Sequence, residues 1–399
     1  MSEEIEKIYD DLVAAGLLPG VTVFAGDRSG KLLYTKSVGK GSLKDGADLA
    51  LTESTMCIIA SMTKLMTSVA VLQCVEDGKL DLDQDVKSLL PDIGKHGILT
   101  GFDGDTPVLE PNTTPITLRL LLTHTSGHEY DFISSTIAKW RASRNETPWL
   151  GKTIEEKSVV PLLFTPGTGF AYGHGHDWAG KAIEKATGMT LEEFMRLRIW
   201  TPLGIENDAS FFPELREDMK NRLATVSTLS EKGEPPAAYA EQFDARFGAT
   251  DCLGGGPCWI TPRAHFTFLS AVAQRDPKLL KPSSYQELFR PQLDEVCEKA
   301  MNDCIASSPV YTHLLGLGIA PAHRVTWSLA GMFVKQDIEG HCSEGTVLWA
   351  GATTSQWFID SKAGVFGTCI AQILPPMFPP VMQEHAKFQQ LVYQKFGQK

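Results

Sequence analysis

The chain has 399 residues, of which 43% are hydrophobic and 21% charged, and its formal net charge at pH 7 is −11. This composition is typical of a globular protein with ample material for a core, and it argues against a disordered chain. The acidic balance, without any run of Lys and Arg, argues against a nucleic-acid-binding surface.

The first 20 residues begin acidic and carry apolar residues at helical spacing, which predicts an amphipathic helix. They lack the basic and apolar regions of a secretory signal, and no later window approaches the ~20 apolar residues of a membrane span. If the sequence is complete at its start, we expect a cytoplasmic protein. Its eight cysteines would then be reduced, and we expect most of them to be buried as small hydrophobes.

The next elements form a hairpin and then a long helical region. Two β-rich runs, 21–25 and 32–38, are separated by the turn sequence DRSG and predict a hairpin. Helical patterns then dominate, and they cover 57–77, 115–127, 134–144, 176–205, 263–274 and 283–289.

From about residue 312 the pattern turns to strands again. The predicted strands are LLGLGIA, VTWSLAGMFV, TVLWAG, SQWFID and VFGTCIAQIL, and an amphipathic helix follows them. Strands at both ends with helices between them predict a sheet assembled from the two termini. We expect a sheet domain of residues 1–55 plus 310–399 and a mainly helical domain of residues 56–309. The active site would lie at their junction, where ligand clefts tend to form.

Ser61 and Lys64 form an S-x-x-K pattern at the start of the helix predicted after residue 57. A spacing of three places both side chains on one helical face, close enough for the amine to take the proton of the hydroxyl. A second match occurs at Ser37 and Lys40, and a chain of this size carries roughly one such match by chance. Because Ser37 lies in a run typical of a strand and its exit, the context favours Ser61 as the nucleophile.

A serine–lysine pair needs a third partner, because a lysine amine of ordinary pKa ~10.4 is almost always charged at pH 7. A tyrosine phenol can relay a proton between the serine, the lysine and a leaving group. Tyr172 stands out among the eight tyrosines because it lies in FTPGTGFAYGHGHDW, a Pro- and Gly-rich loop that leads into a helix. The alternative interpretation of Tyr172 is a packing residue.

Five segments, taken together and in this order, resemble the serine β-lactamase and penicillin-binding-protein superfamily. They are SMTK from Ser61, TLRLLLTHTSG from Thr117, PGTGFAYG around Tyr172, LGGGPCWITP at 253–262 and WAG at 349–351. More narrowly, the chain is similar to class C β-lactamases and their esterase and acyltransferase relatives, above all the fungal acyltransferases of the lovastatin/simvastatin-synthase type. The resemblance covers nearly the whole chain. It implies an α/β (α+β) fold with an antiparallel sheet built from both termini, flanked by helices, and a large inserted helical domain.

The resemblance also implies roles for individual residues. Ser61 would be the acyl nucleophile, Lys64 the base or proton relay, and Tyr172 the partner that deprotonates Ser61 and protonates the leaving group. The backbone N–H groups of Ser61 and Ala352 would form the oxyanion hole, which an acyl-transfer intermediate requires. No cofactor is implied.

Two departures from the lactamase pattern narrow the range of reactions that we expect. The lactamase Tyr-x-Asn motif has His174 as its third residue here, and the Lys-Thr-Gly that binds the carboxylate of a lactam is replaced by Trp349, Ala350 and Gly351. An aromatic residue in place of a cation favours neutral, hydrophobic acyl groups or alcohols. The motif positions make His174, Trp349 and Gly351 the predicted substrate-binding residues.

Two other motifs resemble ligand-binding sites but do not have the spacing of one. The HGHD run with His174, His176 and Asp177 matches no ligand spacing of a hydrolase, and no second cluster completes it, so we predict no metal site. The glycines at 254–256 follow no nucleotide-binding pattern and predict tight packing near the cleft wall.

The first functional hypothesis is a serine acyltransferase. It would move an acyl group from a thioester or ester donor, possibly on a carrier protein, to an alcohol of a small polyketide-like metabolite. The alternative is a carboxylesterase that hydrolyses small esters with the same Ser-Lys-Tyr residues. The sequence does not separate them, because the choice of acceptor depends on how the cleft excludes water. A third hypothesis, a catalytically silent binding protein, conflicts with the presence of all three residues. We expect no nucleic-acid or membrane partner.

Overall fold

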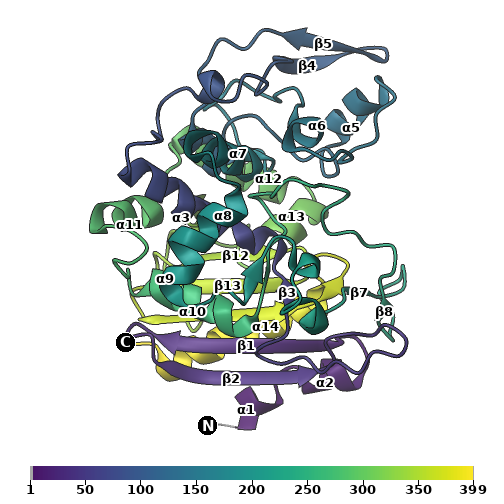
Figure 1. Ribbon diagram of the computed structural model, residues 1–399, viewed down its shortest axis with the longest axis vertical. Helices are drawn as coiled ribbons and strands as arrows, with labels where there is room; N and C mark the ends of the chain where they lie inside the picture. The colour runs from purple at the N-terminus through teal and green to yellow at the C-terminus, as the bar shows by residue number, and fades with distance from the viewer. Residues whose placement is uncertain (1–2, 399) are drawn as a thin grey trace.

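The computed structural model describes residues 3–398, and one antiparallel sheet of seven strands runs through its lower half (Figure 1). The strand order is β10-β11-β12-β13-β14-β1-β2. Strand β1 (Gly20–Asp27) pairs with β2 (Leu32–Gly39) on one side and with β14 (Val365–Ala371) on the other. The sheet is therefore assembled from both termini, as the sequence predicts. Its other strands are β10 (Val325–Trp327), β11 (Met332–Val334), β12 (Val347–Gly351) and β13 (Ser355–Asp360).

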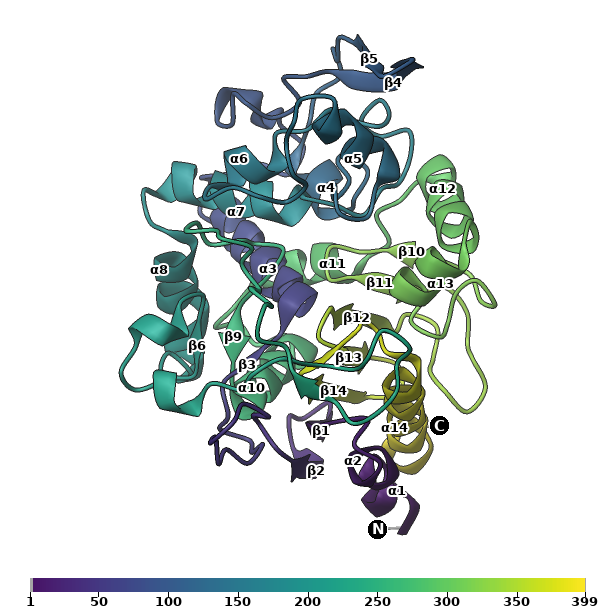
Figure 2. The same cartoon turned by 90° about the vertical axis from the view of Figure 1, so that its right-hand side faces the viewer.

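Helices cover both faces of the sheet, which Figure 2 shows nearly edge-on. Helix α14 (Pro379–Phe396) packs on β14 from one side, and α10 (Pro262–Ala273) packs on β14 and β1 from the other. The N-terminal helix is split into α1 (Glu3–Lys7) and α2 (Asp10–Ala14). Tyr9 causes the break, because its left-handed backbone (φ 73°) directs a buried phenol to His385 Nδ1 of α14 at 2.8 Å.

The helical part surrounds one central helix, α3 (Thr63–Glu76). It contacts α7 (Gly175–Thr187) and α11 (Pro282–Phe289), and α7 contacts α4 (Leu118–Leu122). Twelve of the 14 residues of α3 are buried, so this helix is enclosed on nearly all sides and is not amphipathic.

Smaller elements complete the helical part. The remaining helices are α5 (Ser135–Ala142), α6 (Ile154–Ser158), α8 (Leu191–Met195), α9 (Thr201–Leu203), α12 (Glu295–Ala306) and α13 (Pro309–Leu315). The short strands are β3 (Cys57–Ile58), β4 (Ile98–Asp103), β5 (Thr106–Glu110), β6 (Ala209–Ser210), β7 (Ser227–Thr228), β8 (Ala238–Tyr239), β9 (Trp259–Ile260) and β15 (Ile373–Leu374).

One predicted strand is absent, and one hairpin was not predicted. The run LLGLGIA is not a strand, because α13 ends within it; Pro309 at the first helical position and a hydrogen bond from the Tyr311 N–H to the Ser308 hydroxyl start this helix. The β4–β5 hairpin was not predicted. It forms the top of the molecule in Figures 1 and 2.

One hydrophobic core joins residues of the sheet and residues of the helical part. The domain boundaries at residues 55/56 and 309/310 therefore stay a prediction. Within residues 3–398, no helix has the length and apolar character needed to cross a membrane.

Candidate active site

The chain turns sharply from a strand into a helix at Ser61. Strand β3 is held by pairing with β9, and α3 begins at Thr63, only five residues after β3 ends at Ile58. Ser61 lies between them in η1 (Ala60–Met62), a single 3₁₀ turn. Ala60 takes the left-handed conformation with φ 43°, which costs a non-glycine residue about 1 kcal/mol and is frequent at functional sites. The turn places Ser61 at the N-terminal end of α3, where the helix dipole favours negative charge.

Lys64, in the first turn of α3, is only 3% exposed and reaches three oxygens. Its Nζ lies 3.1 Å from Ser61 Oγ, 3.3 Å from the Tyr130 hydroxyl and 2.8 Å from the Gly255 carbonyl oxygen. A neutral amine has two N–H groups and one lone pair. Tyr130 and Gly255 are placed to accept two hydrogens of Lys64 Nζ, so in the neutral form that a general base requires, the lone pair would face Ser61 Oγ.

Asp177 closes a ring of hydrogen bonds around Lys64. Its Oδ2 accepts from the Tyr130 hydroxyl at 3.5 Å, and its Oδ1 accepts from the Gly255 N–H at 2.8 Å. Burial raises the pKa of Asp177 to about 6, although the charge of Lys64 and the two hydrogen bonds oppose this shift. Burial and the nearby carboxylate raise the pKa of Tyr130 well above its usual value, so Tyr130 stays a phenol that can donate.

Neither a role for Tyr130 nor one for Asp177 was predicted from the sequence. Tyr130 lies three residues beyond the segment TLRLLLTHTSG, and Asp177 lies five residues beyond Tyr172. Their positions next to recognised segments were the available signal, but no spacing rule connects either of them to Lys64.

Tyr172 lies beside both Lys64 and Tyr130, and the centroids of the two tyrosine rings are 5.7 Å apart. Its hydroxyl accepts a hydrogen bond from Trp349 Nε1 at 3.2 Å, and Lys64 Nζ lies 4.8 Å from the centroid of its ring. The structure therefore brings Tyr172 and Trp349 together beside the Ser61–Lys64 pair, with the Tyr172 hydroxyl held by the indole.

A cavity of about 410 Å³ opens above Ser61, and Ser61, Tyr172, Trp349 and Ala352 all line it. Most of the remaining wall is apolar and comes from four separated parts of the chain: the loop around residue 132, the segment 243–247, α13 and the turn at 376–377. The lining side chains from these parts are Phe132, Ile133, Phe243, Ala245, Phe247, Val310, Leu314, Leu315, Pro376 and Met377.

Glycines allow backbone segments to approach closely at this site. A Cβ at Gly255 would lie 2.7 Å from the Tyr130 hydroxyl, and one at Gly256 would lie 2.6 Å from the Ala60 carbonyl oxygen. A Cβ at Gly351 would overlap the Ile59 carbonyl oxygen. The glycine cluster thus packs tightly against the site, as predicted, and Gly351 lets β12 pack against the turn that carries Ser61.

His174 lies behind the cavity wall and does not line it. Its ring is fully buried, stacks on Trp149 at 4.8 Å between centroids and lies edge-on to Tyr130 at 4.7 Å. Its Nδ1 is hydrogen-bonded to the Ser158 hydroxyl at 3.0 Å. Since Trp149 and Tyr130 are lining residues, His174 supports the wall of the cavity rather than contacting its contents.

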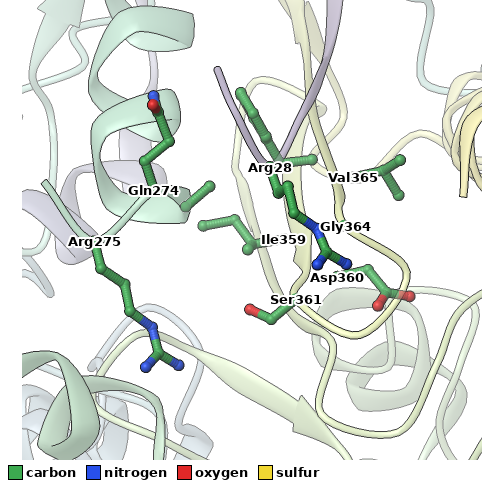
Figure 3. A pocket seen from close by; sticks show the side chains of 10 residues that line it. Arg28, Gln274, Arg275, Ile359, Asp360, Ser361, Gly364 and Val365 are labelled. Carbon is green, nitrogen blue, oxygen red and sulfur yellow. The ribbon is translucent and has the colours of Figure 1, made fainter. Parts of the chain in front are cut away.

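Figure 3 shows a second cavity, of about 280 Å³, at the end of α10 and beside the turn between β13 and β14. Polar side chains border it, among them Arg28, Gln274, Arg275 and Asp360. No predicted site residue is found among the described residues that line this cavity.

The antiparallel sheet from both termini, with a serine–lysine pair where it meets the helical part, defines a class of serine enzymes with the β-lactamase fold. The chain belongs to the Beta-lactamase family, whose model matches residues 5–391. The fold predicted from the sequence is thereby confirmed, and so is the resemblance on which it rested.

Similar chains include enzymes of fungal statin metabolism. The chain is 34% identical to "Lovastatin esterase" of Penicillium rubens, over 98% of both chains, and 32% identical to "Monacolin J acid methylbutanoyltransferase" of Aspergillus terreus, over 99% of this chain and 96% of that protein. Among solved structures, unliganded simvastatin synthase from Aspergillus terreus matches with a TM-score of 0.89 and 30% identity, covering 100% of this chain and 99% of that one. These relatives are esterases and acyltransferases, and the present chain is a serine enzyme of the same family.

Proposed function

We propose that the protein is a serine acyltransferase that moves an acyl group from a thioester or ester donor to an alcohol of a small polyketide-like metabolite. The observation that carries this proposal is the Ser61–Lys64 contact of 3.1 Å at the base of a largely apolar cavity. Two relatives with 32% identity, named as methylbutanoyltransferases, support the transfer of an acyl group.

In the first half of the reaction, Ser61 Oγ attacks the acyl carbonyl carbon while its proton moves to Lys64 Nζ. The oxyanion that forms is bound by the backbone N–H groups of Ser61 and Ala352, two residues that both line the cavity. The C–S or C–O bond to the leaving group then breaks. Tyr172 gives its phenol proton to the departing sulfur or oxygen and takes the proton held by Lys64 in its place, which leaves an ester on Ser61.

In the second half, the hydroxyl of the acceptor attacks this ester and gives its proton to the same relay, which returns it to Ser61. Tyr130 and Gly255 hold Lys64 throughout, because their oxygens accept its remaining hydrogens. Trp349 keeps the Tyr172 hydroxyl at the cavity surface.

Ester hydrolysis is the second candidate, in which water takes the place of the alcohol in the second half. The relative with 34% identity, named as an esterase, favours this candidate. The two functions share the acyl-enzyme and differ only in the acceptor.

One incubation separates the two candidates. The protein is given an acyl thioester with and without a candidate secondary alcohol, and both the acyl ester and the free acid are quantified. Transfer predicts that acyl ester accumulates when the alcohol is present, whereas thioester consumption that yields only free acid would contradict transfer and favour hydrolysis. The Ser61→Ala variant should consume the thioester no faster than buffer does.

A further inference from the structure

Aromatic side chains form one continuous side of the cavity above Ser61. Tyr130, Phe132, Trp149 and Phe247 all line it, and we refer to these residues as the aromatic wall. Phe132 stacks on Tyr130 at 4.9 Å between ring centroids. It also stacks on Phe247 at 6.5 Å and lies edge-on to Trp149 at 5.4 Å. The aromatic wall comes from three separate loops and from no helix or strand, so contacts between the loops must fix its shape.

Two residues of the aromatic wall have an unfavourable backbone conformation. Trp149 has φ 60° and Phe247 has φ 49°, in the left-handed region that residues with a Cβ rarely adopt. Such a conformation persists only where the surrounding structure holds it, and it is frequent at ligand-binding sites. These two peptide groups therefore need partners that hold them.

Lys157 of α6 is a shared partner of both peptide groups. Its side chain is fully buried, and its Nζ donates to the Trp149 carbonyl oxygen at 2.6 Å and to the Phe247 carbonyl oxygen at 2.7 Å. Hydrogen bonds from a charged donor are stronger than those between neutral groups. One ammonium group thus joins two loops that are far apart in the sequence.

Asp131 and Arg141 hold the third loop and the other end of the Trp149 peptide. The buried Asp131 carboxylate accepts from the Trp149 N–H at 2.9 Å and from Arg141 Nε at 3.0 Å. Arg141 Nη2 donates in turn to the Lys157 carbonyl oxygen at 2.6 Å. This buried network connects all three loops of the aromatic wall to α6.

We propose that Lys157 is a positioning residue, which holds the aromatic wall in the shape that bulky substrates contact. This inference rests on the proposed acyl-transfer function, because it concerns binding in the same cavity. Lys157 is not among the described residues that line the cavity, so it acts through Trp149 and Phe247. Without its hydrogen bonds, the two peptide groups can leave the left-handed conformation and move the rings. A substrate that fills the cavity then loses contacts that a small substrate never makes.

Two substitutions of Lys157 separate its hydrogen bonds from its volume. Lys157→Met keeps an unbranched side chain of similar length and removes every N–H donor. Lys157→Gln keeps two N–H donors on one nitrogen, although its side chain is shorter. Lys152→Met is the matched control, since Lys152 is an exposed lysine shortly before α6.

The test compares vinyl acetate, which is small on both sides of the ester, with 2-naphthyl hexanoate, which is bulky on both sides. In Lys157→Met we expect KM for the bulky ester to rise at least about tenfold while its kcat falls at most about threefold. We expect kcat/KM for vinyl acetate to fall at most about threefold. Lys157→Gln should raise KM for the bulky ester only about threefold, and Lys152→Met should leave both esters within about twofold of their native values.

Asp244→Ala loosens the same loop from the surface. The exposed Asp244 carboxylate accepts from the N–H groups of Arg246 at 2.9 Å and Gly248 at 2.7 Å, on either side of Phe247 in the sequence. This variant should raise KM for the bulky ester about threefold, with a smaller effect on vinyl acetate. If Lys157→Met does not fold, the comparison is decided by Asp244→Ala together with Lys157→Gln.

The outcomes distinguish this role from the proposed function. Equal losses of kcat/KM for both esters in Lys157→Met would show a general structural role and overturn the proposal. So would a KM for the bulky ester within about twofold of native in Lys157→Met or, if that variant does not fold, in both Asp244→Ala and Lys157→Gln. Either result would leave the proposed function intact. Turnover of both esters that is equal in the native protein and in Ser61→Ala would instead overturn the proposed function, and the role of Lys157 with it.

Discussion

Lys64 shows how a common residue pair becomes a specific site. The three oxygens within 3.3 Å of its Nζ come from Ser61, Tyr130 and Gly255, and only the first of these lies near it in the sequence. Tyr130 is 66 residues away and Gly255 is 191. The S-x-x-K pattern and its helical context identified the pair, but the groups that orient the amine depend on how distant loops pack.

The ionisation of Asp177 should control activity at mildly acidic pH. With a pKa of about 6, Asp177 is a carboxylate above this pH and gains a proton below it. Protonation removes the negative charge that faces Lys64 and replaces an acceptor oxygen with a donor, so the hydrogen-bond ring must rearrange. We therefore predict that kcat/KM of the native protein falls as the pH decreases through about 6.

The Asp177→Asn variant tests this assignment. It should lower kcat/KM at pH 7 about 10- to 100-fold and should lack the decrease near pH 6, because no carboxylate remains to titrate. The Asp303→Asn variant is the control, since Asp303 is an exposed carboxylate on α12 that pairs with Lys299. A decrease near pH 6 that persists unchanged in Asp177→Asn would show that another group titrates.

At the scale of elements, the position of Ser61 depends on the connection from β3 through η1 into α3. The hydroxyls of Thr52, Ser54 and Thr55 lie shortly before this connection and are of the kind that caps helices. These hydroxyls instead bond within their own turn, where the Thr52 N–H donates to Thr55 Oγ1 at 2.9 Å. The strand β3 that separates them from α3 is only two residues long, and it forms because β9 pairs with it from more than 200 residues away. A local sequence pattern cannot predict this long-range strand pairing.

Gly256 should be critical for the conformation of the connection between β3 and α3. It has φ 122°, and a Cβ there would lie 2.6 Å from the carbonyl of Ala60, the residue before the nucleophile. We predict that Gly256→Ala lowers the free energy of unfolding by about 2–3 kcal/mol and lowers kcat/KM at least tenfold, because the added methyl displaces the turn that carries Ser61.

Gly188→Ala is the matched control, to be measured by urea denaturation and ester hydrolysis in parallel. Gly188 has φ 73° at the end of α7, and a Cβ there would meet no atom within 4 Å. It should therefore cost about 1 kcal/mol of backbone strain with little change in kcat/KM. Equal losses of activity in the two variants would contradict a specific role for Gly256.

At the scale of the whole molecule, the cavity exists because the sheet and the helical part meet. Trp349 lies in β12 and Ala352 directly follows this strand, whereas Ser61 and Tyr172 come from the helical part. Alternation of strand and helix patterns was sufficient to predict this architecture. It was not sufficient to place α13 at the cavity or His174 behind the wall, because both positions follow from side-chain packing between segments far apart in the chain.

The central claim, an acyl-enzyme on Ser61, is tested most directly by intact-protein mass spectrometry. The protein is mixed with p-nitrophenyl butyrate, quenched in acid within seconds, and weighed before and after peptide mapping. The account predicts a mass increase of one butyryl group, located on the peptide that contains Ser61 and absent from Ser61→Ala. An adduct of equal yield in Ser61→Ala, or one located on another residue, would contradict it.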